Sequence, residues 1–342
     1  MQKCPRSDRV CPEPWTSNKE IAMNLKTILA LLFVLAILGA IAIQYDFFMN
    51  SANNPFIQTA IVNTNSSYPD GPVWMNKALY YAEYSADRIV CRDGRGNTVF
   101  WKESGCGPRA LARFNGTLLV ACRDSASLVH LNLSGEAISR IPADRDGAPL
   151  ERPIDMAPDT AGGLYFITED PVKKTKRTGG SIYYLDRKGA ARKTGVSIRS
   201  AGGIALTGDG RSLLVSERDA NIVLRYDVEA PGRLSGRRLF VRLSDVTAPP
   251  SDTGRDAGPD ALAVDSGGTV FICHSGASRI LLLSETGTLL QVIKTSLPYV
   301  TGIAFGRLDN VAYITAISSL SEPPYNGAVF EFTRKRVRRP AP

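Results

Sequence analysis

The chain has 342 residues, 44% of them hydrophobic, and carries 41 Lys and Arg against 33 Asp and Glu, a formal net charge of +8. The positive excess lies at the two ends: without residues 1–45 and 334–339, 31 basic and 30 acidic residues remain. A nearly neutral body has no basic face for nucleic acid, so the composition argues against a nucleic-acid partner.

Residues 27–43, TILALLFVLAILGAIAI, form an uncharged hydrophobic run. Lys26 directly precedes it, and no Lys or Arg follows before Lys77. This asymmetry predicts a cytoplasmic segment at residues 1–26 and a body on the far side of the membrane. Seventeen residues is about the lower limit for a helix that spans a bilayer. We therefore expect a single-pass membrane protein held by a signal anchor, with its main domain in a periplasmic, lumenal or extracellular space.

A cleaved signal sequence is the alternative reading of the same run. Ala40, Ile41 and Ala42 fit a small-x-small cleavage site, and Met23 rather than Met1 then serves as the start, with a short basic segment before the run. In that case the protein is secreted.

Residues 44–69 form a linker that contains one apparent strand, FIQTAIV at residues 56–62. An N-terminal strand that pairs with the last unit of a ring removes the final exposed sheet edge. We expect this strand to close such a ring. Residues 334–342 form a basic tail.

The body of the chain is a repeat, seen most clearly in residues 258–293, GPDALAVDSGGTVFICHSGASRILLLSETGTLLQVI. Four short apolar runs alternate with Gly, Ser and Asp turns, the pattern of an antiparallel meander. Similar phrases start at Gly71, Gly107, Pro153, Ala201 and Val300. Six units of four strands, repeating at roughly 40 residues, are typical of a propeller. The sequence therefore predicts an all-β fold, a six-bladed β-propeller over residues 70–333.

Four cysteines lie in the propeller, and their spacing shows no zinc motif. Cys122 and Cys273 take the same place in their repeats and are expected to be core residues. Cys91 and Cys106 are the one pair for which a disulfide is considered.

Alignment of the innermost strands selects one position from each repeat, just where the strand starts. These positions hold Asp70, Arg109, Ile154, Gly202, Asp260 and Thr301. Their side chains should converge on one mouth of the central channel, where two carboxylates suit a hard cation such as Ca²⁺. The alternative is that Asp70 and Asp260 cap turns, with Arg109 as counter-ion.

The phrases PDGPVW, RPID, GGIALTGDGRSLLVSE, GPDALAVDSGGTVFICHSGASRI and YVTGIAF resemble the family of gluconolactonase, regucalcin and luciferin-regenerating enzyme. The resemblance covers about residues 68–332 and implies a six-bladed propeller. It also implies a metal-dependent lactonase or related esterase.

The resemblance implies a metal site with four protein ligands. Asp70, in place of a Glu, and Asp260 correspond to the two carboxylates, whereas Ile154 and Gly202 stand where the family has Asn. Arg152 corresponds to an arginine that contacts substrate. We expect a weakened site for a divalent metal, with Ca²⁺ as the expected ion.

The predicted site therefore has Asp260 as the catalytic base, with Asp70 and Asp260 on the metal. The substrate-binding candidates are Arg109, Arg152, His274 and Thr301. No GxSxG, P-loop or dinucleotide motif occurs, which argues against a serine hydrolase and a nucleotide cofactor.

The leading hypothesis is a membrane-anchored, exported, metal-dependent hydrolase of a lactone or ester. The first alternative, motivated by Ile154 and Gly202, is a non-catalytic propeller that binds a small polar or anionic ligand. A propeller for protein interaction is the second.

Overall fold

The structure is a computed structural model that describes residues 33–34, 37, 56–170, 179–249 and 257–334. The chain divides into two compact units, Met1–Phe47 and Phe48–Pro342. Among the described residues, no helix combines the length and the hydrophobicity needed to cross a bilayer. Most of residues 27–43 lie outside the described residues, so the anchor stays a prediction.

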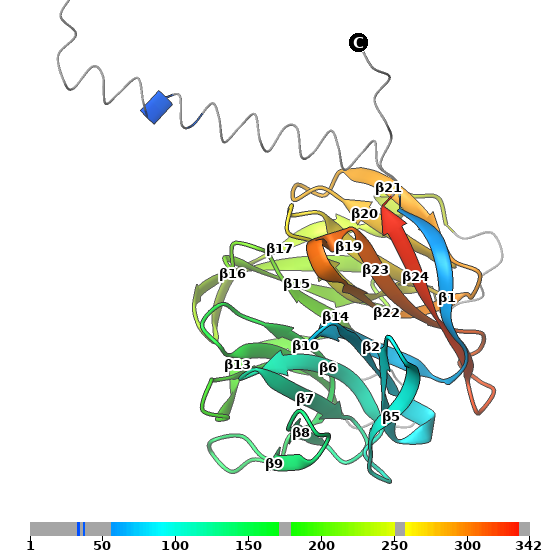
Figure 1. Cartoon of the computed structure of the whole chain (residues 1–342). Coiled ribbons are helices and arrows are strands. Elements are labelled where there is room, and N and C mark those ends of the chain that lie inside the picture. The colour runs from blue at the N-terminus through cyan, green and yellow to red at the C-terminus, as the bar shows by residue number, and fades with distance from the viewer. Residues whose placement is uncertain (1–32, 35–36, 38–55, 171–178, 250–256, 335–342) are drawn as a thin grey trace, which may run out of the picture. The chain divides into compact units, whose positions relative to one another are not determined.

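The strands of the second unit form six four-stranded antiparallel sheets (Figure 1). Blade 1 contains β2 (Pro69–Met75), β3 (Ala78–Glu83), β4 (Arg88–Asp93) and β5 (Gly96–Lys102). Blade 2 contains β6 (Pro108–Phe114), β7 (Thr117–Cys122), β8 (Ser127–Leu131) and β9 (Ala137–Ile141). Blade 3 contains β10 (Arg152–Pro158), β11 (Leu164–Glu169), β12 (Gly180–Leu185) and β13 (Ala191–Ile198).

Blade 4 contains β14 (Ala201–Leu206), β15 (Ser212–Glu217), β16 (Ile222–Ala230) and β17 (Arg233–Arg242), and the short helix α2 (Leu243–Val246) follows it. Blade 5 contains β18 (Gly258–Val264), β19 (Val270–Ser275), β20 (Arg279–Leu283) and β21 (Leu289–Lys294). Blade 6 contains β22 (Tyr299–Phe305), β23 (Val311–Ile317), β24 (Asn326–Arg334) and, as its outermost strand, β1 (Phe56–Ser67). Two 3₁₀ turns, Tyr84–Ala86 and Arg307–Asp309, complete the described elements.

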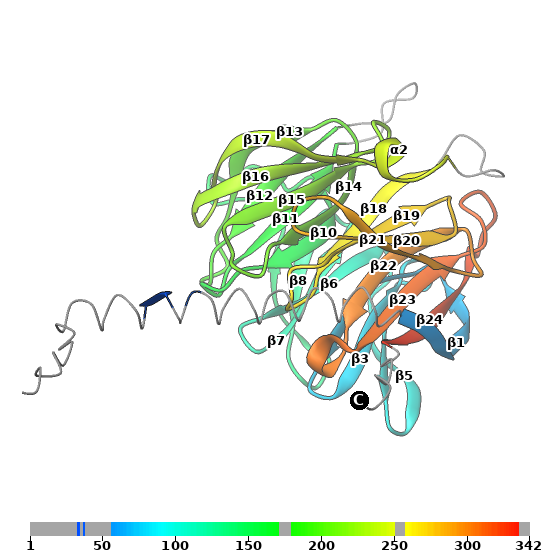
Figure 2. The same ribbon diagram turned by 90° about the horizontal axis from the view of Figure 1, so that it is seen from above.

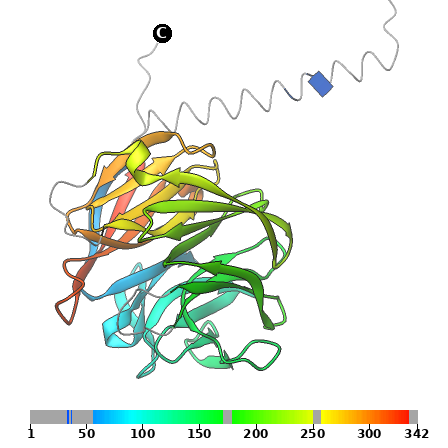
Figure 3. The same cartoon turned by 180° about the vertical axis from the view of Figure 1, so that it is seen from behind.

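The innermost strands contact one another in a closed ring: β2, β6, β10, β14, β18, β22 and again β2. Figures 2 and 3 show the blades following one another around the axis in the order of the colour bar. The predicted six-bladed propeller is confirmed.

Blades adhere to one another through hydrophobic clusters. The described residues contain six such clusters, each made by two neighbouring blades. Between blades 6 and 1, for example, Trp74 stacks on Tyr313 with ring centroids 5.4 Å apart. Each sheet thus buries both of its apolar faces against the two neighbouring blades, which removes them from water.

The ring is closed by β1, which pairs with β24 in an antiparallel register from Phe56 opposite Arg334 to Ser67 opposite Asn326. Figure 1 shows β1 in blue beside β24 in red. The strand expected at residues 56–62 lies within β1. The pairing of β1 with β24 places the two ends of the propeller chain on the same blade. Phe56 is buried against Phe271 of blade 5, with ring centroids 5.7 Å apart, so β1 also contacts the neighbouring blade.

Every innermost strand shows a register shift against its second strand close to its start. The shifts lie between Asp70 and Val73, Pro108 and Ala110, Pro153 and Asp155, Ala201 and Ile204, Pro259 and Leu262, and Val300 and Gly302. Such bulges re-aim side chains and are common next to sites. Here the bulges lie at the starts of the innermost strands, whose side chains line one mouth of the channel.

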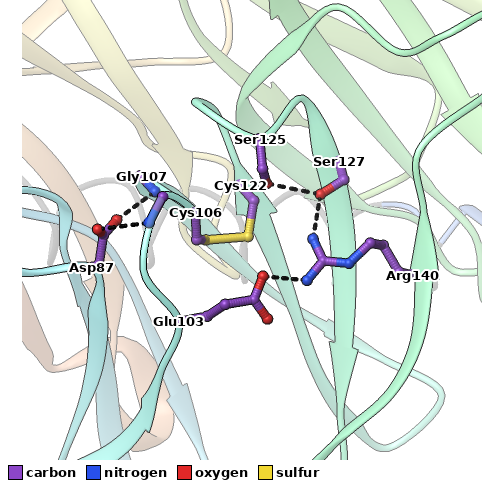
Figure 4. Close-up of a disulfide and its surroundings, with 9 residues drawn as sticks. Asp87, Glu103, Cys106, Gly107, Cys122, Ser125, Ser127 and Arg140 are labelled. Carbon is purple, nitrogen blue, oxygen red and sulfur yellow. Dashed lines mark hydrogen bonds and ion pairs between the residues drawn. A yellow bond between two sulfur atoms is a disulfide. The ribbon is translucent and has the colours of Figure 1, made fainter.

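The disulfide joins Cys106 to Cys122 (Figure 4), so the predicted pairing of Cys91 with Cys106 is wrong. Cys91 is free and half-buried on β4, the third strand of blade 1. Cys122 ends β7, where its neighbour across the sheet is Pro108, two residues beyond Cys106. Cys122 and Cys273 are both buried in the core, as predicted, and Cys122 also bridges to Cys106.

The disulfide fixes the entry to β6. Beside it, the carboxylate of Asp87 accepts hydrogen bonds from the backbone N–H groups of Gly105 and Gly107, at 2.9 and 2.8 Å (Figure 4). Gly107 has a φ of +56°, and a Cβ there would overlap the side chain of Asp124. Only glycine suits this turn, and Arg109 follows two residues later.

We predict that removal of this disulfide lowers the free energy of unfolding. A double Cys106→Ala, Cys122→Ala variant should lose about 2–4 kcal/mol, because a loop of this size gains entropy when its cross-link is cut in the unfolded chain. Urea unfolding of the purified full chain measures the loss. Cys91→Ser, at the free cysteine, is the matched control and should change stability less. Equal losses in both variants would contradict the prediction.

Candidate functional site

A cavity of about 80 Å³ opens at the axis, lined by the starts of all six innermost strands. All six positions aligned from the sequence line it: Asp70, Arg109, Ile154, Gly202, Asp260 and Thr301. Asp155 and apolar neighbours such as Leu111 and Met156 complete the wall.

Each of the two predicted carboxylates lies against an arginine. Arg109 donates from Nε to Asp70 Oδ2 at 2.6 Å, and Arg218 donates from Nη1 to Asp260 Oδ2 at 2.7 Å. These side chains are between 6% and 17% exposed. Ion pairs so far from water are costly to break, because the partner left behind is an uncompensated charge.

Burial raises the pKa of two carboxyls at the mouth. The pKa of Asp70 rises to about 7, chiefly through burial, against the attraction of Arg109 and with a further rise from Asp260. The pKa of Asp155 also rises to about 7 through burial, although the backbone N–H groups of Met156 and Ile204 donate to its two oxygens at 2.8 and 2.9 Å. A carboxyl with a pKa near 7 is a candidate for proton transfer at neutral pH.

Arg109 rests on aromatic rings. Its Cζ lies 5.1 Å from the ring centroid of Tyr68 and 5.6 Å from that of Tyr84, both within cation–π range. Tyr68 is buried and has a φ of +53°, an uncommon conformation for a bulky residue that often accompanies a functional site. Burial raises the pKa of Tyr68 to about 12, so its hydroxyl keeps its proton.

Thr301 lines the cavity, but its hydroxyl is engaged in the ring. It donates to the carbonyl oxygen of Pro69 at 2.6 Å and lies 2.9 Å from the hydroxyl of Thr315. Thr301 therefore links blade 6 to blade 1 directly behind Asp70.

Arg152 and His274 are not among the residues lining the cavity. Arg152 Nη2 lies 3.3 Å from Asp124 Oδ1, which also bonds Arg123. His274 is 2% exposed and accepts a hydrogen bond at Nδ1 from Arg279 Nε. Burial, with Arg279 and Arg218 nearby, lowers the pKa of His274 to about 4. Their substrate-binding roles stay predictions without a contact to the cavity.

Three residues of the site escaped the alignment of innermost strands: Asp155, Arg218 and Tyr68. Arg218 directly follows β15, the second strand of its blade, and antiparallel pairing brings the end of the second strand to the start of the first. Arg123 follows β7 in the same way. Alignment of the phrases ACRD and SERD, which end these two strands, is the sequence signal that points to Arg218.

The residues present do not fit a divalent cation. Ca²⁺ takes six to eight oxygens, yet Ile154 and Gly202 offer no side-chain oxygen, and the carboxylates of Asp70 and Asp260 are held by guanidinium groups. Asp155 accepts backbone N–H groups at both of its oxygens. In the described part of the chain no group of three or more His, Cys, Asp and Glu is placed to hold a metal. The expected Ca²⁺ site therefore lacks support in the donor set.

Residues 68–318 match the family described as the SMP-30/Gluconolactonase/LRE-like region. The match takes in most of the propeller. The chain belongs to this family. The resemblance inferred from the sequence is thereby confirmed.

Two curated relatives align along most of their length. A 6-deoxy-6-sulfogluconolactonase from Pseudomonas putida is 26% identical over 283 residues, 79% of this chain and 92% of the relative. A pentonolactonase from Haloferax volcanii is 24% identical over 266 residues, 75% of this chain and 84% of the relative.

Among solved structures, a regucalcin from Agrobacterium tumefaciens, described as a calcium-binding protein, superposes with a TM-score of 0.67. It is 18% identical, and the superposition covers 83% of this chain and 96% of that one. At this identity the likeness shows the shared propeller fold alone.

The raised pKa of Asp155 predicts a pH-dependent stability difference. Between about pH 4 and about pH 7 the unfolded chain releases the proton of Asp155 while the folded chain keeps it, so the contribution of Asp155 to stability falls as pH rises. Asp155→Asn removes this titration. The unfolding free energy of wild type minus that of Asp155→Asn should therefore decrease from pH 4 to pH 7.

Urea unfolding of the two chains across this pH range measures the difference, in which the contributions of groups that do not interact with Asp155, such as His274, cancel. The charges of Asp70 and Asp260 act on Asp155, so the difference includes their coupling to it. A difference that stays constant or grows with pH would contradict the prediction.

Proposed function

We propose that this protein hydrolyses small lactones at the channel mouth. The observation that carries the proposal is the carboxylate of Asp260, which lines the cavity and is held in place by Arg218 at 2.7 Å. Membership of the family supports it, as do the two curated relatives, both named as lactonases. Since these relatives are named for sugar-derived lactones, the substrate class we propose is a lactone of a sugar acid.

In the proposed reaction, Asp260 accepts a proton from a water molecule whose oxygen adds to the lactone carbonyl carbon. The ring C–O bond then breaks, and the leaving oxygen takes a proton. Water and lactone thus give one hydroxy acid, with no oxidant or further reactant. The backbone of Asp260 is fixed as well, because Ser216 Oγ donates to its carbonyl oxygen at 2.9 Å.

Asp70 is the proposed proton donor to the leaving oxygen. Its pKa of about 7 leaves it partly protonated at neutral pH, which suits a group that must give up a proton and regain it. Its other neighbours restrain it: Gly71 N–H donates to Oδ1 at 2.8 Å and Arg109 holds Oδ2.

A propeller that binds a small polar or anionic ligand without turnover is the second candidate function. The apolar Ile154 and the glycine at position 202 favour it, because the mouth lacks the amide oxygens that the family resemblance implies there. Binding of a hydroxy acid without hydrolysis of its lactone would distinguish this function from the first.

We further propose that the propeller is exported and held at a membrane. The charge asymmetry around residues 27–43 supports this location, and so does the Cys106–Cys122 disulfide, which is typical of oxidising compartments. Protease accessibility of the propeller in bacterial spheroplasts that express the full chain tests it, because removal of the outer membrane exposes a periplasmic domain while the cytoplasm stays closed. Protection of the propeller until the spheroplasts are lysed would refute it.

We predict that Asp260→Asn lowers kcat/KM for an aldonolactone by about 100- to 10,000-fold, the usual contribution of a positioned general base. Asparagine keeps the size and a hydrogen-bond acceptor for Arg218 but cannot take a proton from water. Hydrolysis by the full chain is measured by acid release across a panel of five- and six-membered aldonolactones.

Asp227→Asn is the control, since Asp227 on β16 pairs with Arg238 on β17 and both side chains are about half-exposed. This variant should hydrolyse lactones at the wild-type rate. Wild-type activity in Asp260→Asn, or no hydrolysis of any lactone by the wild-type chain, would refute the proposed function.

A further inference from the structure

The mouth of the channel carries two guanidinium groups where the family resemblance implies a divalent cation. Arg109 comes from the innermost strand of blade 2 and reaches Asp70 of blade 1; Arg218 comes from blade 4 and reaches Asp260 of blade 5. Both pairs therefore cross from one blade to the next. The arginine of each pair supplies, from within the protein, the positive charge that its carboxylate partner requires.

Several neighbours fix the guanidinium group of Arg109. Burial works against its charge, but the acidic side chains of Asp70, Glu169 and Asp260 raise its pKa well above the usual value, so it stays a cation. Tyr68 and Tyr84 pack against its guanidinium group, and the ring of Tyr68 packs in turn on Tyr325 with centroids 5.5 Å apart. The Cys106–Cys122 disulfide fixes the chain just before it.

Beside Asp260, strands β14 and β18 lie too close together for an asparagine side chain at position 202 that could serve as a metal ligand. Ser216 Oγ accepts a hydrogen bond from Gly203 N–H at 2.5 Å and donates to the carbonyl oxygen of Asp260 at 2.9 Å. A Cβ at Gly202 would overlap Ser216 Oγ and lie 2.7 Å from the carbonyl oxygen of Pro259. An asparagine at position 202 would therefore push β14 away from β18. The glycine belongs to a repacked site, and not to a metal site that lost one ligand.

We infer that the site works without a metal and that Arg109 binds the oxygen that bears negative charge. In the reaction this is the lactone carbonyl oxygen as water adds to it, and in the product it is the new carboxylate. A guanidinium carries five N–H donors in a planar fork that matches a carboxylate, and Arg109 lines the cavity. In a site screened from water, such a fixed cation stabilises a developing oxyanion strongly.

Arg109 is thus a catalytic residue, and Tyr68 a positioning residue that holds its guanidinium group. The part of this inference that concerns turnover rests on the proposed lactone hydrolysis. The part that concerns binding of a hydroxy-acid carboxylate does not.

The first experiment tests the independence from metal. The purified full chain is dialysed against EDTA, and its Tm and lactone hydrolysis are then measured with and without added Ca²⁺, Mn²⁺ or Zn²⁺. We expect hydrolysis within about twofold of the untreated protein and no saturable rise in Tm with any cation. A loss of tenfold or more that one of these cations restores, or a saturable rise in Tm, would overturn the inference.

The second experiment tests Arg109 by binding, which needs no turnover. Calorimetry compares gluconate with sorbitol, a polyol of the same length without the carboxylate. We expect gluconate to bind and sorbitol not to bind. Arg109→Lys, which keeps the charge opposite Asp70, should weaken gluconate binding by tenfold or more, because lysine cannot form the planar fork.

Tyr68→Phe should weaken gluconate binding less than Arg109→Lys does, since the aromatic ring beneath the guanidinium group is kept. Arg238→Lys, on the exposed face of blade 4, is the control and should bind as wild type. The Tm of each variant verifies that it is folded. Gluconate binding that is unchanged in a folded Arg109→Lys variant would overturn the inference, as would equal binding of gluconate and sorbitol.

The two proposals fail in different ways. Gluconate binding that depends on Arg109, with no hydrolysis of any lactone, refutes the hydrolase and leaves the anion site standing. Lactone hydrolysis that is unaffected by Arg109→Lys, with no gluconate binding, refutes the role of Arg109 and leaves the hydrolase standing.

Discussion

The structure depends on the packing of each blade between two others. A four-stranded sheet with apolar residues on both faces is stable only when both faces are covered, and six sheets achieve this only if the ring closes. The pairing of β1 with β24 provides that closure. Because it joins strands from the two ends of the propeller, the whole circle of hydrophobic clusters depends on one contact between residues that are far apart in the sequence.

Closure of the ring also creates the site. Six innermost strands begin around one axis, so the side chains at their starts lie within one cavity whatever their chemistry. Three carboxyls, Asp70, Asp155 and Asp260, line this cavity, and burial raises the pKa of Asp70 and of Asp155. Arg109 and Arg218 compensate two of these charges across the blade boundaries, while Asp155 relies on backbone N–H groups. The electrostatics of the mouth are thus balanced by side chains of this chain.

The repeat made the propeller predictable, because every blade needs the same order of apolar runs and turns. It also placed the six cavity positions correctly, since equivalent positions of a ring must meet at the axis. The disulfide was predicted wrongly because spacing along the chain says nothing about which strands lie side by side: Cys122 approaches Cys106 through the pairing of β7 with β6, whereas Cys91 lies on β4. The phrases ACRD and SERD, at the ends of β7 and β15, share an arginine that points to Arg218. Alignment of the innermost strands alone does not reveal this residue.

The partners of the carboxylates were harder to predict than the carboxylates themselves. An aspartate at the start of an innermost strand is equally compatible with a metal, a turn or an ion pair, because all three satisfy a buried negative charge. The choice is made by a residue on another strand, as with Arg218, or by the space between two strands, as at Gly202, where β14 approaches β18 too closely for a side chain. Substitution of two amide positions by isoleucine and glycine therefore does not by itself indicate a lost function. Together with two partly buried arginines that pair with carboxylates of the mouth, it indicates that the same mouth has changed the source of its positive charge.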